Sequence, residues 1–211
     1  MYIANDLDTL LPNFIVSKLR RKPLVYDAHE YFTGQFGLEE HRFAYSVWKR
    51  IERWIIPGLK YMITVNNSIA CLYNEEYGVS PVVVRNMAWS AGTITAVERK
   101  DLGIDPGVLL VVIQGTGLNQ GRGLPELIEA LKITPGVHLL VIGSGDAISE
   151  IRKRIDENDL AGHVTILPNM PWPEMISFTK TCDAGISLDK PVSINQRLSL
   201  PNKLFDYISS G

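Results

Sequence analysis

The feature that most constrains the fold of this chain is the regular alternation of short apolar runs with helical patterns. Apolar runs at residues 23–28, 61–65 and 81–84 are separated by segments whose apolar residues recur at helical spacing. The second half continues the pattern, with expected strands at 108–113, 138–142, 164–167 and 184–188. Chains that alternate strand and helix form parallel sheets covered by helices, and near-continuous apolar strands are buried on both faces.

The alternation lapses at residues 89–107, where Ala, Gly, Thr, Lys, Asp and Pro dominate. We therefore predict an α/β fold of two parallel-sheet units, residues 1–88 and 108–211, joined by a connection at 89–107. Both units are expected to be incomplete. The first has few strong strands, and the chain ends at Gly211 on a helix with no following strand.

Composition excludes several classes of protein. The 21 Lys and Arg residues are balanced by 23 Asp and Glu residues, so no basic field indicates a nucleic-acid partner. Cys71 and Cys182 have no CxxC spacing, which argues against a disulfide scaffold or a cysteine-based zinc site. The apolar runs are too short to cross a bilayer, and the start of the chain lacks a signal-peptide pattern. We expect a cytoplasmic protein.

The strongest local signal is the glycine-rich segment Gly-Thr-Gly-Leu-Asn-Gln-Gly-Arg-Gly at 115–123, which falls between an apolar strand and a helix. Such a loop lets the backbone approach a ligand, and the helix directs its positive end there. The Arg122 guanidinium can hold a phosphate bidentately. The alternative is a glycine-rich turn with a solvated arginine. The candidate ligand-binding residues of this loop are Gly115, Thr116, Gly117 and Asn119.

A second glycine loop, Gly143-Ser-Gly145, follows the next strand. Ligands of open parallel sheets bind outside the carboxyl ends of the strands, so both loops are expected to open on one edge and to form a nucleotide-diphosphate cleft. By itself the Gly-Ser-Gly pattern is equally typical of a tight turn. Gly143 and Gly145 are nevertheless included as candidates for binding the nucleotide diphosphate.

The third element is Ser-Leu-Pro-Asn-Lys-Leu-Phe-Asp-Tyr-Ile at 199–208. Asn202 begins a helix and Lys203 lies in its first turn, where a cation opposes the helix dipole. An anionic ligand would explain that placement. Asp206 follows on roughly the same face and could accept ribose hydroxyls. The alternative is an exposed Lys203–Asp206 pair along the helix.

His29 follows an apolar strand and is flanked by Asp27 and Glu30, so we expect it to face a cleft, although a lone histidine is often structural. The four histidines are His29, His41, His138 and His163. Their spacing matches no metal-ligand motif, and we expect no metal and no cofactor.

In order and spacing, these three motifs resemble the donor half of group-1 (family 4) retaining glycosyltransferases. The segments Asn-Asp-Leu-Asp-Thr-Leu at 5–10, Val-Tyr-Asp-Ala-His-Glu at 25–30 and Val-Arg-Asn-Met at 84–87 resemble the acceptor domain of that family. The resemblance implies the GT-B fold, in which two Rossmann-like domains face each other across a cleft. Residues 1–88 would be the acceptor side and 108–211 the donor side. It also implies that family residues are missing at both ends of this chain.

The resemblance also implies roles for individual residues. Arg122 matches the basic residue that holds the donor diphosphate. Thr116 stands where many members carry a second arginine, so Lys203 is expected to supply that charge. His29 matches the histidine beside the transferred sugar.

The two glutamates that mark the family are not both preserved. The second falls on Asp206, whereas the first falls on Leu198. Asn195 or Asp189 is therefore an alternative contact for the sugar.

The implied function is transfer of a sugar, with retention, from a nucleoside-diphosphate donor to a hydroxyl of a glycan or lipid-linked acceptor, in polysaccharide synthesis. The alternatives are a nucleotide-sugar epimerase and a non-catalytic nucleotide-binding fragment.

Self-association through incomplete sheets is expected. Peripheral contact with the inner face of the membrane is a further expectation. It would use two basic and aromatic clusters, Lys18, Arg20, Arg21 and Lys22, and Trp48, Lys49, Arg50, Arg53 and Trp54.

Overall fold

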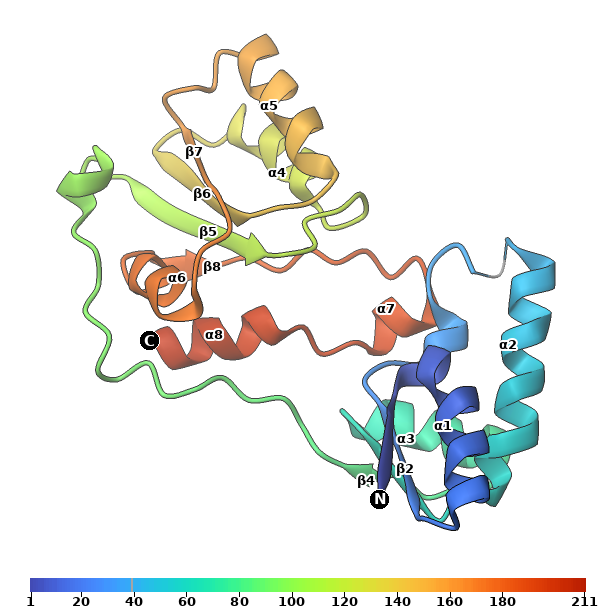
Figure 1. The fold of residues 1–211 in the computed structure, drawn as a ribbon. Helices are drawn as coiled ribbons and strands as arrows, with labels where there is room; N and C mark the ends of the chain where they lie inside the picture. Colours follow the sequence, from blue (N-terminus) through green and yellow to red (C-terminus); the bar gives the residue numbers. More distant parts are fainter. Residues whose placement is uncertain (39) are drawn as a thin grey trace. The chain divides into compact units, whose positions relative to one another are not determined.

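The computed structural model describes residues 1–38 and 40–211, and these residues form two compact units. The first unit contains residues 1–86 together with 191–200. The second contains residues 87–190 together with 201–211. Each unit has its own sheet and its own helices (Figure 1).

The first unit is built on a four-stranded parallel sheet in the order β1-β2-β3-β4. Its strands are β1 (Tyr2–Asn5), β2 (Leu24–Ala28), β3 (Tyr61–Thr64) and β4 (Val82–Val83). Its α-helices are α1 (Asp6–Arg20), α2 (Arg42–Ile55), α3 (Asn67–Tyr77) and α7 (Ile194–Leu198), and its 3-10 turns are η1 (Phe32–Gly34) and η2 (Ile56–Gly58). Each strand pairs with the next along the chain, so the crossovers all advance in one direction.

Local sequence sets where these helices begin and end. The Asn66 side chain caps α3 by accepting the Ile69 backbone N–H at 2.9 Å. Gly78 ends the same helix with φ of 69°, a left-handed conformation that favours glycine. The apolar faces of the helices close over the sheet. The core includes Leu7, Leu10, Tyr26, Ile55 and Tyr73, each at most 1% exposed.

The second unit has a four-stranded parallel sheet in the order β7-β6-β5-β8. Its strands are β5 (Leu109–Gly115), β6 (Val137–Gly143), β7 (Val164–Leu167) and β8 (Ala184–Gly185). Its helices are α4 (Leu124–Leu131), α5 (Ala147–Glu157), α6 (Trp172–Thr179) and α8 (Asn202–Ser210), with the 3-10 turn η3 (Arg99–Leu102). The chain proceeds from β5 to β7 on one side and then returns to place β8 on the other side of β5. A topological switch point therefore lies between β5 and β8.

The central strands of the second sheet are buried on both faces, as their continuous apolar sequence predicts. Ile113 and Val141 point to the face that α4 and α5 cover. Leu110 and Leu140 point to the opposite face, where residues of α6 and Tyr207 of α8 pack. All four strand residues are at most 1% exposed, because the alternation of side chains along a strand supplies one apolar set to each helix layer.

The division into units differs from the expected boundaries at residues 191–200 and at residues 87–107. Residues 191–200 were expected within the unit 108–211, but they pack with the first unit. The Leu198 side chain packs against the first core, and the Asn66 side chain donates to the Leu198 carbonyl at 2.8 Å. We call residues 191–200 the strap. It starts after Lys190 of the second unit and leads back to Pro201 of the same unit.

The expected connection 89–107 groups with the second unit. Arg99 explains this grouping, because its guanidinium makes an ion pair with Asp183 at 2.5 Å and donates to the Thr181 carbonyl. Within the described residues, no helix is both long and apolar enough to span a lipid bilayer.

Candidate functional site

Two cations meet one carboxylate at the carboxyl ends of β5 and β8. Arg122 lies in the loop after β5, and Asp189 lies in the loop after β8. The Arg122 guanidinium binds one oxygen of Asp189, and the Lys203 Nζ lies 3.6 Å from the other. The side chains of Asp189 and Lys203 are only 7% and 11% exposed. We call Arg122 and Lys203 the cation pair, and Asp189 its bridging carboxylate.

Packing of the loops places these three residues together. Gly123 has φ of 79°, and a Cβ there would lie 2.3 Å from the Leu188 Cβ, so the two loops can approach only because this residue is glycine. The Lys190 N–H donates to the Gly121 carbonyl at 3.0 Å. On the other side, Tyr207 lies over Gly185, which fixes α8, and with it Lys203, beside β8.

The electrostatics of the cation pair favour an anion. Burial disfavours the ionised carboxyl of Asp189, but the hydrogen bond from Arg122 and the charge of Lys203 outweigh it and hold the pKa of Asp189 below its usual range. Burial lowers the pKa of Lys203, with the Asp189 charge opposing that shift. Two cations face one carboxylate, so a net positive charge remains at the switch point.

The two glycine loops, expected to open on one edge, are locked to each other. The Leu118 N–H donates to the Ser144 carbonyl at 2.9 Å. A Cβ at Gly145 would lie 2.2 Å from the Leu118 carbonyl oxygen, and one at Gly143 would lie 1.9 Å from the Gly115 oxygen. The glycines of the second loop are therefore required for contact between the loops. This gives Gly143 and Gly145 a packing role in addition to the binding role that we expected.

The Asn119 side chain also joins the two loops. Its amide oxygen accepts the Asp146 N–H at 3.1 Å, and the Asp146 carboxylate accepts the Gln120 N–H at 2.8 Å. Thr116 and Asn119 are exposed, as is Asn202 at the start of α8, whereas Gly115 and Gly117 are half-buried.

Asp206 does not pair with Lys203 along α8. Its two carboxylate oxygens accept from Trp172 Nε1 at 2.9 Å and from Gln114 Nε2 at 3.2 Å. Gln114 is itself buried and accepts from the Thr179 hydroxyl at 2.6 Å. Asp206 thus ties α8 to β5 and α6, and it positions the helix that carries Lys203.

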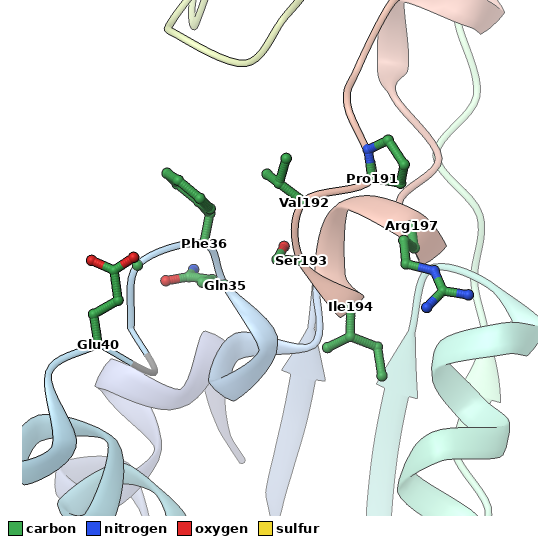
Figure 2. A pocket seen from close by; sticks show the side chains of 9 residues that line it. Gln35, Phe36, Glu40, Pro191, Val192, Ser193, Ile194 and Arg197 are labelled. Atoms are coloured by element: carbon green, nitrogen blue, oxygen red, sulfur yellow. The ribbon is translucent and has the colours of Figure 1, made fainter.

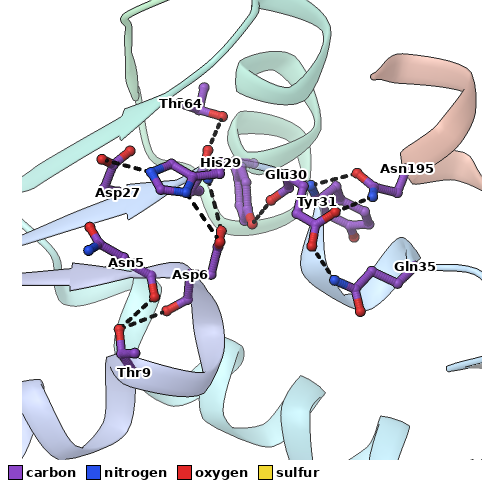
Figure 3. A network of polar contacts seen from close by, with 12 residues as sticks. Asn5, Asp6, Thr9, Asp27, His29, Glu30, Tyr31, Gln35, Thr64 and Asn195 are labelled. Carbon is purple, nitrogen blue, oxygen red and sulfur yellow. Dashed lines mark hydrogen bonds and ion pairs between the residues drawn. The ribbon is translucent and has the colours of Figure 1, made fainter. Parts of the chain in front are cut away.

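In the first unit, His29 lies between two aspartates at the carboxyl ends of β1 and β2 (Figure 3). Its Nδ1 is 3.4 Å from Asp6 and its Nε2 is 3.1 Å from Asp27. The His29 backbone N–H also donates to Asp6 at 2.9 Å. Burial raises the pKa of Asp6, and the contacts with His29 oppose that shift. The imidazole is half exposed and is held in a fixed orientation.

Glu30, the next residue, joins two separate segments of the first unit (Figure 3). One carboxylate oxygen accepts from the Gln35 side chain and the other accepts from Asn195 Nδ2 at 2.6 Å. The Asn195 amide oxygen accepts the Tyr31 N–H at 3.0 Å. Asn195, predicted from the sequence as a sugar contact, has both ends of its amide engaged within the first unit.

The predicted basic surface is wrong in one residue, because Lys49 is buried. Its Nζ lies 2.9 Å from Glu52 and 2.8 Å from Glu76, and it also contacts the hydroxyls of Tyr31 and Tyr77. Burial disfavours the charged lysine, but the bonds to these partners outweigh it and raise the pKa of Lys49. Lys49 lies on the inner face of α2 as part of a charged cluster inside the first unit.

The sequence pattern leaves several of these partners unassigned. Nothing in the local pattern around Gln114 or Trp172 indicates that both bind Asp206, and the pattern suggests Asp189 only as a sugar contact. In the described part of the chain, no group of three or more His, Cys, Asp or Glu side chains is arranged to hold a metal ion.

No family model and no curated protein matches the sequence of the chain. Solved structures do match its fold. HepE from Anabaena in complex with UDP is 19% identical with a TM-score of 0.63, over 87% of this chain and 52% of that one. HepE has also been solved with UDP-glucose. Sucrose-phosphate synthase from Thermosynechococcus elongatus is 14% identical with a TM-score of 0.62, over 87% of this chain and 48% of that one.

The pneumococcal O-GlcNAc transferase GtfA, solved with UDP and GlcNAc, is 13% identical with a TM-score of 0.57, over 94% of this chain and 38% of that one. The chain thus spans about half the length of HepE and less of GtfA. The likeness confirms the expected fold, two Rossmann-like units of the GT-B type found in these glycosyltransferases.

Proposed function

We propose that this chain forms the sugar-transfer site of a glycosyltransferase whose donor is a nucleoside-diphosphate sugar. The observation that carries the proposal is the convergence of Arg122 and Lys203 on Asp189 at the switch point of the second sheet. Ligands of open α/β sheets bind at this point, and two half-buried cations suit a diphosphate. The similarity of fold to HepE, solved with UDP and UDP-glucose, supports this class of donor.

In the proposed reaction, the bond between the anomeric carbon and the diphosphate breaks while a bond to the acceptor oxygen forms on the same face. The acceptor proton passes to an oxygen of the departing phosphate, so no strong protein base is needed. Negative charge grows on the leaving diphosphate. The Arg122 guanidinium and the Lys203 ammonium stabilise that charge, and Asp189 keeps both cations in position.

His29 is proposed to contact the transferred sugar. Its contacts with Asp6 and Asp27 fix the plane of the imidazole, so that one ring face and edge are presented at the carboxyl ends of the first sheet. A preoriented ring loses little further entropy when the sugar packs against its exposed face and edge. Asp206 is proposed to act through its bonds to Gln114 and Trp172 as well as on the ribose.

The proposed acceptor is a hydroxyl of a glycan or of a lipid-linked sugar. Two exposed apolar side chains, Leu19 at 77% and Trp54 at 63%, lie on the helices that carry the exposed cations Lys18, Arg20 and Arg53. Apolar side chains among cations suit the surface of an anionic membrane. This arrangement supports contact with a membrane-bound acceptor, although Lys49 is buried and contributes nothing to the surface.

Calorimetric titration with UDP and with GDP, with and without magnesium, tests the donor site. Arg122→Ala should abolish most of the binding, whereas Arg152→Ala, which removes an exposed arginine of α5, should leave it unchanged. Absence of binding by the folded wild-type chain, or equal binding by Arg122→Ala, would refute the assignment. Strict dependence on magnesium would refute only the expectation that no metal takes part.

A further inference from the structure

A pocket of about 290 Å³ lies within the first unit, between the strap and the residues that follow η1 (Figure 2). We call these residues, 35–38 and 40, the turn. The turn contributes Gln35, Phe36 and Glu40, and the strap contributes Val192, Ile194 and Arg197. This volume is close to the lower end of small-molecule sites, which is about 300 Å³. It suits one or two sugar rings.

One part of the lining is apolar and open. Phe36 is 66% exposed and Val192 is 50% exposed, and Figure 2 shows both side chains directed away from Ile194. Ile194 closes the base, where it lies so near the turn that a Cβ at Gly34 would be 2.2 Å from its Cγ2. An exposed phenyl ring at a pocket mouth offers a flat surface to a ligand with an apolar face.

The other part of the lining carries opposite charges on its two walls. Glu40 belongs to the turn and Arg197 to the strap, and both are exposed. Neither the Glu40 carboxylate nor the Arg197 guanidinium has a hydrogen bond or an ion pair with another of the described residues. These two groups can therefore bond to a ligand without breaking a protein contact. Their charges cancel, so the pocket favours a neutral polar ligand over an ion.

Glu30 holds the two walls together. One of its oxygens binds Gln35 in the turn, and the other binds Asn195 in the strap at 2.6 Å (Figure 3). Because Glu30 follows His29 directly, the pocket is linked by one residue to the histidine proposed to contact the transferred sugar. The strap continues at its amino end into Lys190 and Asp189.

We propose that this pocket binds a neutral sugar ring of the acceptor, stacked on Phe36 and hydrogen-bonded through its hydroxyls to Glu40 and Arg197. The inference rests on the proposed function for its role in catalysis, but the binding itself can be measured without a donor. A pyranose ring has an apolar C–H face that packs on an aromatic ring and hydroxyls that bond to carboxylate and guanidinium groups. An acyl chain would leave both charges unpaired, and this disfavours a lipid in the same place.

Saturation-transfer NMR on the whole chain tests the proposal. The probes are the methyl glycosides of glucose, galactose and N-acetylglucosamine, with methyl glucuronide and glucose 6-phosphate as anionic counterparts. Wild type should give saturation transfer to at least one neutral glycoside, more strongly than to either anion. Phe36→Ala should weaken that binding by about tenfold, which corresponds to about 1.4 kcal/mol.

Phe43→Ala is the matched control, because Phe43 is also an exposed phenylalanine, at 85%, and lies on α2 outside the pocket. It should bind glycosides as wild type does. Arg197→Gln and Glu40→Gln should each weaken binding while the far-ultraviolet circular dichroism stays unchanged. No saturation transfer to any neutral glycoside, stronger binding of the anions, or equal binding by Phe36→Ala would overturn the proposal.

A UDP titration of the same Phe36→Ala sample separates this inference from the donor site. If UDP binds and no glycoside does, the pocket assignment is wrong and the proposed function stands. If glycosides bind in a Phe36-dependent way and UDP does not, the pocket is a sugar site and the proposed donor site is wrong.

Discussion

The Asn195 side chain donates to the Glu30 carboxylate at 2.6 Å across 165 residues of sequence. This bond fastens the strap to the first unit, and the backbone N–H of Tyr31 completes it by donating to the Asn195 amide oxygen. Asn195 is 8% exposed, and its bond from Tyr31 is buried, whereas its bond to Glu30 is half-buried. The segment of chain that leads from Asp189 to Lys203 is therefore anchored to the first unit at its middle.

Loss of this anchor should destabilise the first unit. Asn195→Ala leaves the buried Tyr31 N–H without its partner, and a buried polar group left unpaired costs about 1–3 kcal/mol, whereas the half-buried Glu30 oxygen can be rehydrated. We expect the free energy of unfolding in urea to fall by about that amount. Asn195→Asp keeps the acceptor for Tyr31 but places two carboxylates together, and it should be no more stable than Asn195→Ala at pH 7. Wild-type stability in Asn195→Ala would show that the strap does not depend on the Asn195 bonds.

Arg122→Lys should restore only part of the nucleotide affinity that Arg122→Ala loses. We expect the alanine variant to weaken UDP binding by about 1.5–3 kcal/mol, since hydrogen bonds to charged groups contribute that much. A lysine supplies a charge but no planar fork for two phosphate oxygens. Calorimetry on the three proteins checks the order wild type, lysine, alanine. Equal affinity of the lysine variant and wild type would mean that charge alone matters.

The stabilising effect of Asp189 should depend on pH. Its pKa in the folded protein is lower than the usual value of 3.8, so the ionised carboxylate stabilises the fold above that value. The contribution is lost as the pH falls through the lower, folded-state pKa. The difference in unfolding free energy between wild type and Asp189→Asn should therefore be largest near neutral pH and shrink below pH ~4.

Urea unfolding of both proteins at several pH values between about 7 and about 3 measures this difference. Asp101→Asn, an exposed residue of η3, serves as the control and should show a small difference at every pH. A constant gap for Asp189→Asn across the series would contradict the ion-pair account of the switch point.

Gly145→Ala should destabilise the second unit, because a Cβ would lie 2.2 Å from the Leu118 carbonyl oxygen. Forcing the two glycine loops apart should cost about 1–3 kcal/mol in thermal or urea unfolding. It should also weaken UDP binding, since the first loop carries Arg122. Gly162→Ala is the matched control, because a Cβ at Gly162 would have nothing within 4 Å and the φ of this residue is not positive. That variant should be neutral or slightly more stable.

Lys49→Met should be strongly destabilising. It removes the cation that lies 2.9 Å from Glu52 and 2.8 Å from Glu76, and Glu52 is fully buried. Breaking a buried pair by removing one partner costs about 3–5 kcal/mol. Arg50→Met, at the next and exposed position of α2, should change the unfolding free energy little. Similar stability of the two variants would place Lys49 in water, as the predicted basic surface requires.

The sequence by itself determined the layers of this protein. Continuous apolar strands such as 108–113 can be buried only when helices cover both faces, and alternation with helices requires parallel strands. The positions of the glycine loop, Arg122 and Lys203 relative to the strands and helices could also be predicted from the local pattern, because each lies where a strand ends or a helix begins. These features depend on neighbours within a few residues, and the sequence displays such neighbours directly.

Only the tertiary structure decided which distant residues meet. That Asp189 bridges Arg122 and Lys203, that Asp206 bonds to Gln114 and Trp172, and that Lys49 faces inward all depend on the packing of separate elements. The strap is the clearest case. Its residues mix apolar and polar types in no regular pattern, and they join the first unit where Glu30 and Asn66 offer them hydrogen bonds across more than a hundred residues of sequence. No local propensity encodes such a contact, because its energy exists only once the separate elements that make it have folded together.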